Sequence, residues 1–149
     1  MTPTAADWVE HAHDTLGRDG YRASAARGAV VSALADLRCS VTAKGIADHL
    51  STRGQDVGQA SIYRALELLE RLGLARRVDA GEGVARYEPV DPHGDHHHHL
   101  VCDRCGEVVP FEDSDLERVI ARLADRVDFS VDAHDVTLRG ACPTCRTPR

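Results

Sequence analysis

The sequence has 149 residues, is 42% hydrophobic and carries a formal net charge of −6, a balance that fits one compact domain or two small ones and excludes an unfolded chain. It contains no apolar run long enough to cross a bilayer and no signal peptide at its start, so we expect a cytoplasmic protein without a membrane partner. The negative charge does not exclude nucleic acid, because residues 1–86 carry 11 basic and 11 acidic residues, and the excess, 7 basic against 13 acidic, falls in residues 87–149.

The first half of the chain is predicted to hold four helices followed by a β-hairpin. Apolar residues recur at steps of three and four, and polar N-cap residues precede two of the helices. The predicted elements are a helix at 5–17, helices capped by Ser24 and Thr42, a helix at 62–73, and strands at 74–79 and 84–88 joined by the turn 80–83. Helices followed by a short hairpin predict a winged helix-turn-helix.

The second half is predicted to be a small α/β module. Residues 89–95 contain two prolines and a glycine and are read as a linker. The elements predicted beyond them are strands at 96–102 and 108–111, a helix from Asp113 or Ser114 to Val127, and a strand at 129–139. A module of about fifty residues often needs a metal or a partner subunit for stability. The fold class is therefore α+β, with domains at 1–88 and 96–149.

Four of the five cysteines form two Cys-x-x-Cys pairs, Cys102/Cys105 and Cys142/Cys145. In a cytoplasmic protein such pairs favour metal or redox chemistry over disulfides. Structural zinc takes four soft ligands in a tetrahedron, and each pair presents two sulfurs from one tight turn. A dithiol redox couple is the alternative, although no thioredoxin-like context surrounds these pairs. We expect a closed zinc site that supports folding, and we read the remaining Cys39 as a small buried side chain.

Four consecutive histidines, His96 to His99, run into the first cysteine pair. On a strand, alternation sends His97 and His99 to one face and His96 and His98 to the other, so one segment could serve two metal sites. A solvated polar loop and an expression tag are the alternatives, but a tag is normally terminal. Further ligands would be needed, and the candidates are Glu88, Glu117 and His134. Each carboxylate taken singly is more often a solvent-facing group than a ligand.

Specific motifs make most of the chain, from about Gly20 to Cys145, resemble the ferric-uptake-regulator (Fur) family of bacterial metal-sensing repressors. These motifs are Tyr21-Arg22-x-Ser24-x-x-Arg27, Ser61-Ile62-Tyr63-Arg64-Ala65-Leu66, His96-His97-His98-His99-Leu100-Val101-Cys102-x-x-Cys105-Gly106, and Cys142-x-x-Cys145. The resemblance implies a homodimer with an N-terminal winged helix and a C-terminal α/β dimerisation domain. Metal at the hinge between these domains would lock the two DNA-binding domains in a geometry that fits the operator.

The resemblance also implies three metal sites. The four paired cysteines would hold structural zinc, and a site inside the dimerisation domain would use His96, His98, Glu117 and His134. The regulatory hinge site would use Glu88, His97 and His99, but the family's usual fourth ligand, a histidine, is replaced here by Cys39-Ser40. Either Cys39 takes its place and favours a zinc-like metal, or the site uses three protein ligands and water. The zinc-uptake branch of the family has an acidic ligand and a cysteine ligand where this chain has Arg76 and Val90. The regulatory metal is thus expected to be iron or zinc, with manganese or nickel open.

The same resemblance places DNA contacts on the winged helix. Arg64 near the start of the recognition helix can donate two hydrogen bonds to guanine, and Tyr63 can contact a thymine methyl group, with Ser61 beside them. Arg22 can reach a phosphate or a narrow minor groove, and Arg27 a phosphate.

These features predict a metal-dependent, DNA-binding repressor of metal-homeostasis genes rather than an enzyme. Two alternatives remain. A peroxide sensor of the same family would use bound iron to oxidise a ligand histidine. A zinc hydrolase would need a His-Glu-x-x-His helix or an open coordination position with a placed base, and the sequence has no such helix.

Overall fold

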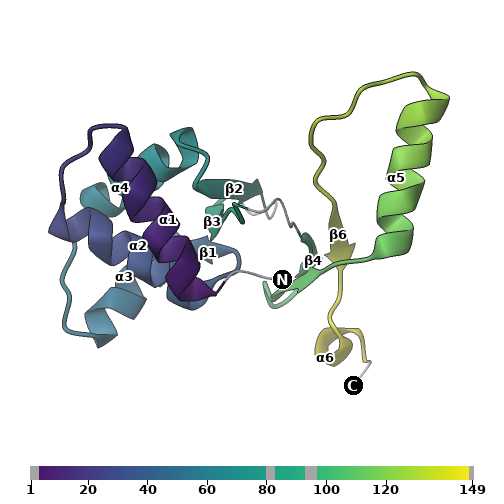
Figure 1. The fold of residues 1–149 in the computed structure, drawn as a ribbon. Helices are drawn as coiled ribbons and strands as arrows, with labels where there is room; N and C mark the ends of the chain where they lie inside the picture. Colours follow the sequence, from purple (N-terminus) through teal and green to yellow (C-terminus); the bar gives the residue numbers. More distant parts are fainter. Residues whose placement is uncertain (1–3, 80–82, 93–96, 148–149) are drawn as a thin grey trace. The chain divides into compact units, whose positions relative to one another are not determined.

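A computed structural model describes residues 4–79, 83–92 and 97–147 of the chain. The chain forms two compact units, Met1–Asp95 and His96–Arg149, and each unit contains a three-stranded sheet of its own (Figure 1). Three features predicted from the sequence lie outside the described residues: the turn at 80–82, linker residues 93–95, and His96.

The first unit begins with a bundle of four helices. They are α1 (Ala5–Arg18), α2 (Ala25–Leu37), α3 (Ala43–Thr52) and α4 (Gln59–Arg71). The predicted caps of α2 and α3 are confirmed, because Ser24 Oγ accepts a hydrogen bond from Arg27 N at 3.3 Å and Thr42 Oγ1 accepts one from Gly45 N at 2.9 Å. Each hydroxyl satisfies a backbone N–H that the helix itself leaves without a partner.

The core of this unit lies where the helices meet. Leu34, Ile46, Ile62 and Leu66 are fully buried there, one from each of α2 and α3 and two from α4. The α4 residues come from the predicted stripe at steps of three and four, which turns Tyr63 and Arg64 outward. The face of α4 that carries the candidate DNA contacts is therefore set by packing on the opposite face.

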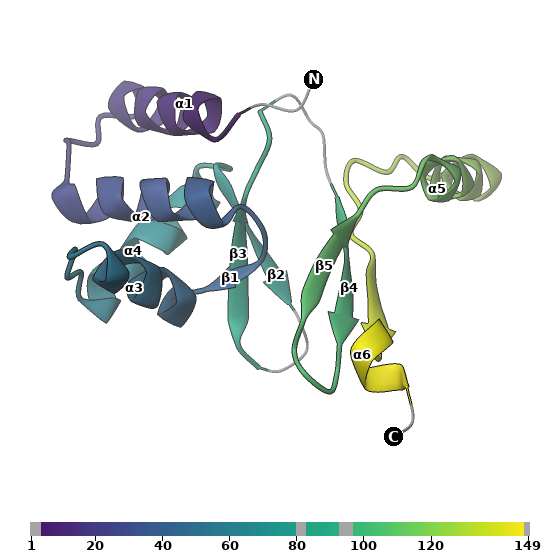
Figure 2. The ribbon, with the colours of Figure 1, turned by 90° about the horizontal axis from the view of Figure 1, so that it is seen from below.

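A small sheet completes the first unit. Its strands are β1 (Val41–Thr42), β2 (Ala75–Asp79) and β3 (Ala85–Pro89), in the order β1-β3-β2, and Figure 2 shows them beside the helices of the same unit. The two predicted strands of the hairpin are confirmed. The sequence did not predict β1, because two residues show no periodicity. Helices followed by this antiparallel wing form a winged helix-turn-helix.

The second unit is a three-stranded sheet with one long helix. Its elements are β4 (His98–Cys102), β5 (Val108–Phe111), α5 (Ser114–Arg126), β6 (Thr137–Gly140) and the short α6 (Pro143–Arg146). Strand β4 lies in the middle, antiparallel to β5 and parallel to β6. Asp113 caps α5 by accepting a hydrogen bond from Leu116 N at 2.9 Å, which settles the two predicted helix starts in favour of Asp113 as the cap.

The predicted strand at 129–139 is wrong over most of its length. Strand β6 begins only at Thr137, whose partner in β4 is His99. The described part of β4 starts at His98, so residues before Val136 have no strand beside them to complete a ladder. The chain also leaves α5 through Asp128 with a left-handed φ of 52°. His134 therefore lies in an irregular segment and not in the middle of a strand.

Helix α5 buries none of its residues within the described part of the chain. Its apolar face is nevertheless well formed: Val119, Leu123 and Val127 recur at steps of four and are about half exposed. Phe129, just past the helix, is 69% exposed. Such a face needs a covering surface, because exposed apolar patches of this kind mark interaction sites. None of the described helices is both long and apolar enough to span a membrane.

Candidate metal centres and nucleic-acid surface

The sheet of the second unit brings the two cysteine pairs together. Cys102 ends β4, and Gly140 at the end of β6 is its partner in the parallel ladder. Parallel neighbours end at the same edge of a sheet, so Cys142, two residues after β6, emerges beside Cys102. Gly106, with a φ of 78°, closes the turn that carries Cys105. The strand–helix–strand excursion between the pairs thus returns the second pair to the first, as the sequence predicts.

The four sulfurs have the spacing of a tetrahedral zinc site. All four lie within 4.8 Å of one another, and the sulfurs of Cys105 and Cys142 are 3.8 Å apart. A tetrahedron with zinc–sulfur bonds of about 2.3 Å has sulfur–sulfur edges of about 3.8 Å. The residues present therefore fit structural zinc, which would need no large movement of the chain.

Backbone donors surround Cys102 in particular. Cys142 N donates to its sulfur at 3.3 Å, and hydrogen bonds from the backbone of Cys142 and Cys105 lower the pKa of the Cys102 thiol to about 6. The neighbouring sulfur of Cys142 has the opposite effect on Cys145, whose pKa is raised to about 12 because the two sulfurs share a proton. The fold thus favours one thiolate, and a zinc ion would displace the protons of the other three thiols.

A second cluster in the same unit joins β4, α5 and the irregular segment before β6. Glu117 accepts contacts from two imidazoles: its Oε1 lies 2.7 Å from His98 Nε2 and its Oε2 lies 2.7 Å from His134 Nε2. His98 is fully buried, whereas His134 is partly exposed. Glu117 sits in the first turn of α5, which aims its side chain at the sheet. The structure therefore brings together three of the four predicted residues of this site, and the fourth, His96, lies outside the described residues.

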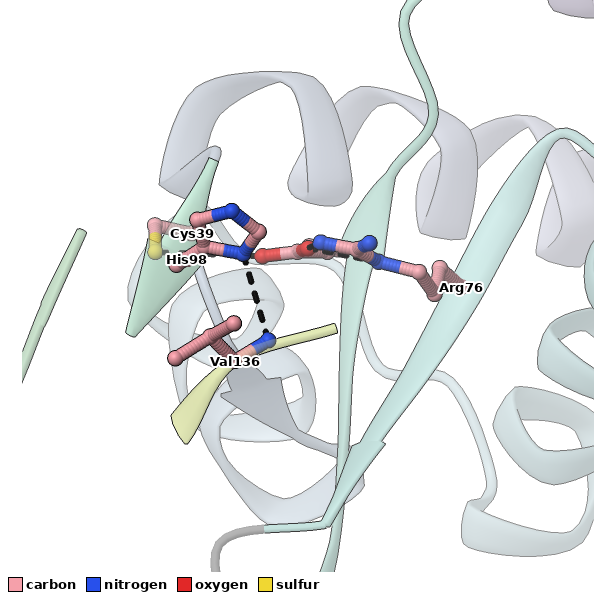
Figure 3. Close-up of polar contacts among 5 residues, drawn as sticks. Cys39, Arg76, His98 and Val136 are labelled. Carbon is pink, nitrogen blue, oxygen red and sulfur yellow. Dashed lines mark hydrogen bonds and ion pairs between the residues drawn. The ribbon is translucent and has the colours of Figure 1, made fainter. Parts of the chain in front are cut away.

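The hydrogen bond between Val136 and His98 determines which nitrogen of the ring carries a proton. Val136 N donates to His98 Nδ1 at 3.2 Å (Figure 3). A backbone N–H can only donate, so Nδ1 is the acceptor, and in the neutral ring Nε2 carries the proton that points to Glu117. The donor set of two imidazoles and a carboxylate suits a divalent metal, but ligation through Nε2 requires that this proton leave and that Val136 release Nδ1.

In the first unit, Glu88 and Cys39 lie together although they are 49 residues apart in the sequence. Cys39 Sγ is 3.9 Å from Glu88 Oε2, and Glu88 is only 1% exposed. The turn after α2 presents the thiol, since Arg38 and Ser40 on either side both have left-handed φ values, 60° and 43°. Arg86 braces this turn by donating from Nη1 to Ser40 O at 3.2 Å. Of the two interpretations that the sequence leaves open for Cys39, this contact favours the possible ligand over the inert side chain.

In the second unit, His97 and His99 lie together. Their ring centroids are 4.9 Å apart in an edge-to-face arrangement, and His99 is buried. His98, between them in sequence, turns instead to Glu117 and His134. This separation follows the alternation expected from the sequence, even though β4 begins only at His98.

The candidate DNA-contacting residues gather in two places of the winged helix. At the start of α4, Arg64 Nη2 donates to Ser61 Oγ at 3.1 Å, and Tyr63 is 42% exposed. Between α1 and α2, Arg27 Nη1 donates to Arg22 O at 2.8 Å. The Arg27 guanidinium also lies over the ring of Tyr21, 5.6 Å from its centroid. Arg22 and Arg27 line a cavity of about 270 Å³ at this corner. Both places present guanidinium groups to solvent, as phosphate or base contacts require.

Two partners of the predicted ligands were not predicted from the sequence. Arg76 forms an ion pair with Glu88 from the neighbouring strand (Figure 3), and Val136 contributes only its backbone. The predicted hairpin did not reveal Arg76, because a turn at 80–83 would place Arg76 opposite Tyr87, whereas the observed register places it opposite Glu88. No sequence signal marks Val136, since every residue except proline carries the same N–H.

A winged helix-turn-helix joined to an α/β unit with a four-cysteine centre and a His/Glu cluster defines a DNA-binding protein that carries metal. The ferric uptake regulator family model matches residues 18–139. The ferric uptake regulation protein of Legionella pneumophila is 35% identical over 106 residues, covering 71% of this chain and 76% of that protein. That of Synechococcus elongatus is 29% identical over 148 residues, covering 98% of this chain and 97% of that protein.

Solved structures agree with this match. The Vibrio cholerae ferric uptake regulator superposes with a TM-score of 0.78 at 27% identity, over 87% of this chain and 98% of that one. The Helicobacter pylori ferric uptake regulator gives a TM-score of 0.85 at 22% identity, over 99% of this chain and 97% of that one, and supports the fold. The chain belongs to the ferric uptake regulator family. It is accordingly a metal-dependent transcriptional regulator with an N-terminal winged helix and a C-terminal dimerisation domain.

Proposed function

We propose that this regulator is a homodimeric repressor whose affinity for operator DNA rises when a divalent metal binds Glu88, His97, His99 and Cys39. In this proposal residues 1–88 bind DNA, 89–95 act as the hinge, and 96–149 dimerise. The protein works in the cytoplasm, where operator DNA is found, and its role requires no catalytic step.

The observation that carries the proposal is the burial of Glu88 beside the thiol of Cys39. A carboxylate taken out of water is costly unless it is paired or binds a metal. Arg76 pairs with one oxygen, and the other oxygen faces the thiol. Together with His97 and His99 these groups offer one sulfur, one oxygen and two nitrogens. This donor set suits a four-coordinate transition metal. A bound ion would supply two positive charges and a fixed geometry linking the two units.

Two further metal sites support the regulatory one. The four cysteines hold structural zinc, which stabilises the small second unit. We assign His98, Glu117 and His134, with His96, to a site inside the dimerisation domain, where Glu117 already joins the two described imidazoles.

The dimer is formed through the apolar face of α5 and the residues that follow it. Val119, Leu123, Val127 and Phe129 are exposed in the single chain, and a two-fold axis would place the same face of a second copy against them. Two copies of α4 would then present Tyr63, Arg64 and Ser61 to successive half-sites of the operator, with Arg22 and Arg27 on the backbone.

The test is operator binding by the full dimer, measured with added Fe²⁺, Zn²⁺, Mn²⁺ or Ni²⁺ and again after a chelator has removed the labile metal. Structural zinc must be retained, and its content is measured alongside. We expect affinity to fall when the labile metal is removed, and Glu88→Ala to lack the metal response. Glu112→Ala serves as the matched control, because that carboxylate is exposed on the second unit. Affinity that is unchanged by the chelator would refute the mechanism.

A further inference from the structure

The two oxygens of Glu88 have different neighbours. Oε1 accepts hydrogen bonds from Arg76 Nε at 3.0 Å and from Arg76 Nη2. Oε2 instead faces Cys39 Sγ at 3.9 Å. The guanidinium of Arg76 reaches this carboxylate from the neighbouring strand β2. One oxygen is therefore held by a cation, and the other is directed to a thiol that can bind a metal.

The backbone fixes this arrangement. Arg76 in β2 and Glu88 in β3 are directly opposite in the antiparallel ladder, so their side chains leave the sheet on the same face. The Glu88 side chain is 1% exposed and the Arg76 side chain 26%, so the pair is shielded from water. An arginine keeps its charge at every physiological pH, and its planar group bonds one oxygen through two nitrogens. Removing the guanidinium would take away the positive charge that pairs with this buried carboxylate.

This pairing limits what Glu88 can offer a metal. A carboxylate binds a cation either through both oxygens or through one. Oε1 accepts two N–H donors from Arg76, so the oxygen that a metal would bind is Oε2, which lies on the side of the Cys39 sulfur. Zinc in proteins takes four ligands and accepts sulfur, nitrogen and oxygen, whereas metals such as Mn²⁺ favour six ligands rich in oxygen. A single oxygen beside a thiolate suits the first of these better than the second.

We propose that Arg76 is a specificity-determining residue for the regulatory metal, because by holding Oε1 it restricts Glu88 to one ligand oxygen and so favours Zn²⁺ over Mn²⁺ and Fe²⁺. Arg76 does not touch the metal; it positions the carboxylate that does. The inference rests on the proposed function, since it requires Glu88 to be a ligand.

The experiment compares Arg76→Gln with Arg77→Gln in the full-length protein whose four-cysteine site is filled with zinc. All variants also carry Glu117→Ala, which removes the site of His98, Glu117 and His134, so that added metal reports the regulatory site. Arg77 is the next residue of β2, exposed and opposite Tyr87, so both variants remove one positive charge from the same strand. Affinities for Zn²⁺ and Mn²⁺ are measured by competition with a chelator. The readout is the ratio of the Zn²⁺ affinity to the Mn²⁺ affinity. Loss of a positive charge raises the affinity for both cations, and this general effect cancels in the ratio. Bound Co²⁺ reports the geometry, since four-coordinate Co²⁺ absorbs visible light far more strongly than six-coordinate Co²⁺.

In Arg76→Gln we expect the preference for Zn²⁺ over Mn²⁺ to fall by about tenfold or more, as is typical for residues that orient a ligand. The Co²⁺ absorption should weaken toward that of a higher coordination number. Arg77→Gln should match the wild type in both measurements. Arg76→Lys keeps the charge next to Glu88 but loses the two-nitrogen fork, so it should shift the ratio in the same direction, and it remains informative if the glutamine variant does not fold.

Glu88→Ala separates the two ways in which the inference can fail. If the Co²⁺ signal survives in Glu88→Ala, Glu88 is not a ligand, and the proposed regulatory site falls together with the role of Arg76. If the signal is lost in Glu88→Ala but both Arg76 variants keep the metal ratio and the absorption of Arg77→Gln, the site stands and only the role of Arg76 is overturned.

Discussion

Replacing Leu123 with Ala should weaken the dimer by an amount that can be worked out from its exposure. Leu123 lies at the centre of the α5 face and is 50% exposed in the single chain. Burying a whole leucine side chain is worth about 1.5–3 kcal/mol, so covering the remaining half is worth about 1 kcal/mol. In a two-fold symmetric dimer both copies of Leu123 are replaced, so the loss in the free energy of dimerisation is about 2 kcal/mol. This loss corresponds to a dissociation constant raised by roughly 30-fold.

Sedimentation over a dilution series measures this dissociation constant directly. Asp125→Ala is the matched control, because Asp125 is two positions along the same helix and projects from its opposite face. We expect the control to dimerise like the wild type. A dissociation constant for Leu123→Ala that equals the control value would refute the assignment of α5 to the dimer interface, provided that the variant keeps its helical content.

Three further predictions concern DNA, zinc and pH. Arg64→Ala should cost about 1–3 kcal/mol of specific operator binding in a mobility-shift titration; an equal loss on unrelated DNA would show that Arg64 does not read bases. Cys142→Ser should lose the structural zinc and lower the Tm, and one zinc per chain that remains after a chelator has removed the labile metal would contradict the four-cysteine site. In zinc-free protein, the pKa of Cys102 is lowered from 9.0 to about 6 and that of Cys145 is raised to about 12. A thiol whose pKa is lower in the folded than in the unfolded state contributes stability at pH values above the unfolded pKa, and this contribution is lost as the pH falls to the folded pKa. A thiol whose pKa is raised by folding contributes stability below the unfolded pKa, and this contribution is lost as the pH rises to the folded pKa. The Tm should therefore rise between about pH 6 and 9 and fall above that range. Cys102→Ser should remove the rise, and an unchanged rise would refute its cause.

Much of the fold follows from short-range patterns that the sequence displays by itself. The caps at Ser24, Thr42 and Asp113 were predictable because each side chain bonds a backbone N–H only three residues away. The buried stripe of α4 follows from a period of 3.6 residues. The clustering of the four cysteines was predictable because two Cys-x-x-Cys pairs are typical of structural zinc sites.

The tertiary structure decided what depends on partners distant in the sequence. The start of β6 was mispredicted because a strand ends where its neighbour ends, and the described part of β4 begins at His98. Cys39 was a possible ligand from the sequence, but only a turn with two left-handed residues brings its sulfur to Glu88. The sequence by itself determined which residue types could bind metal. Only the paired strands β2 and β3 decided that Arg76 holds one oxygen of Glu88, because the contact is set by a register that no local pattern encodes.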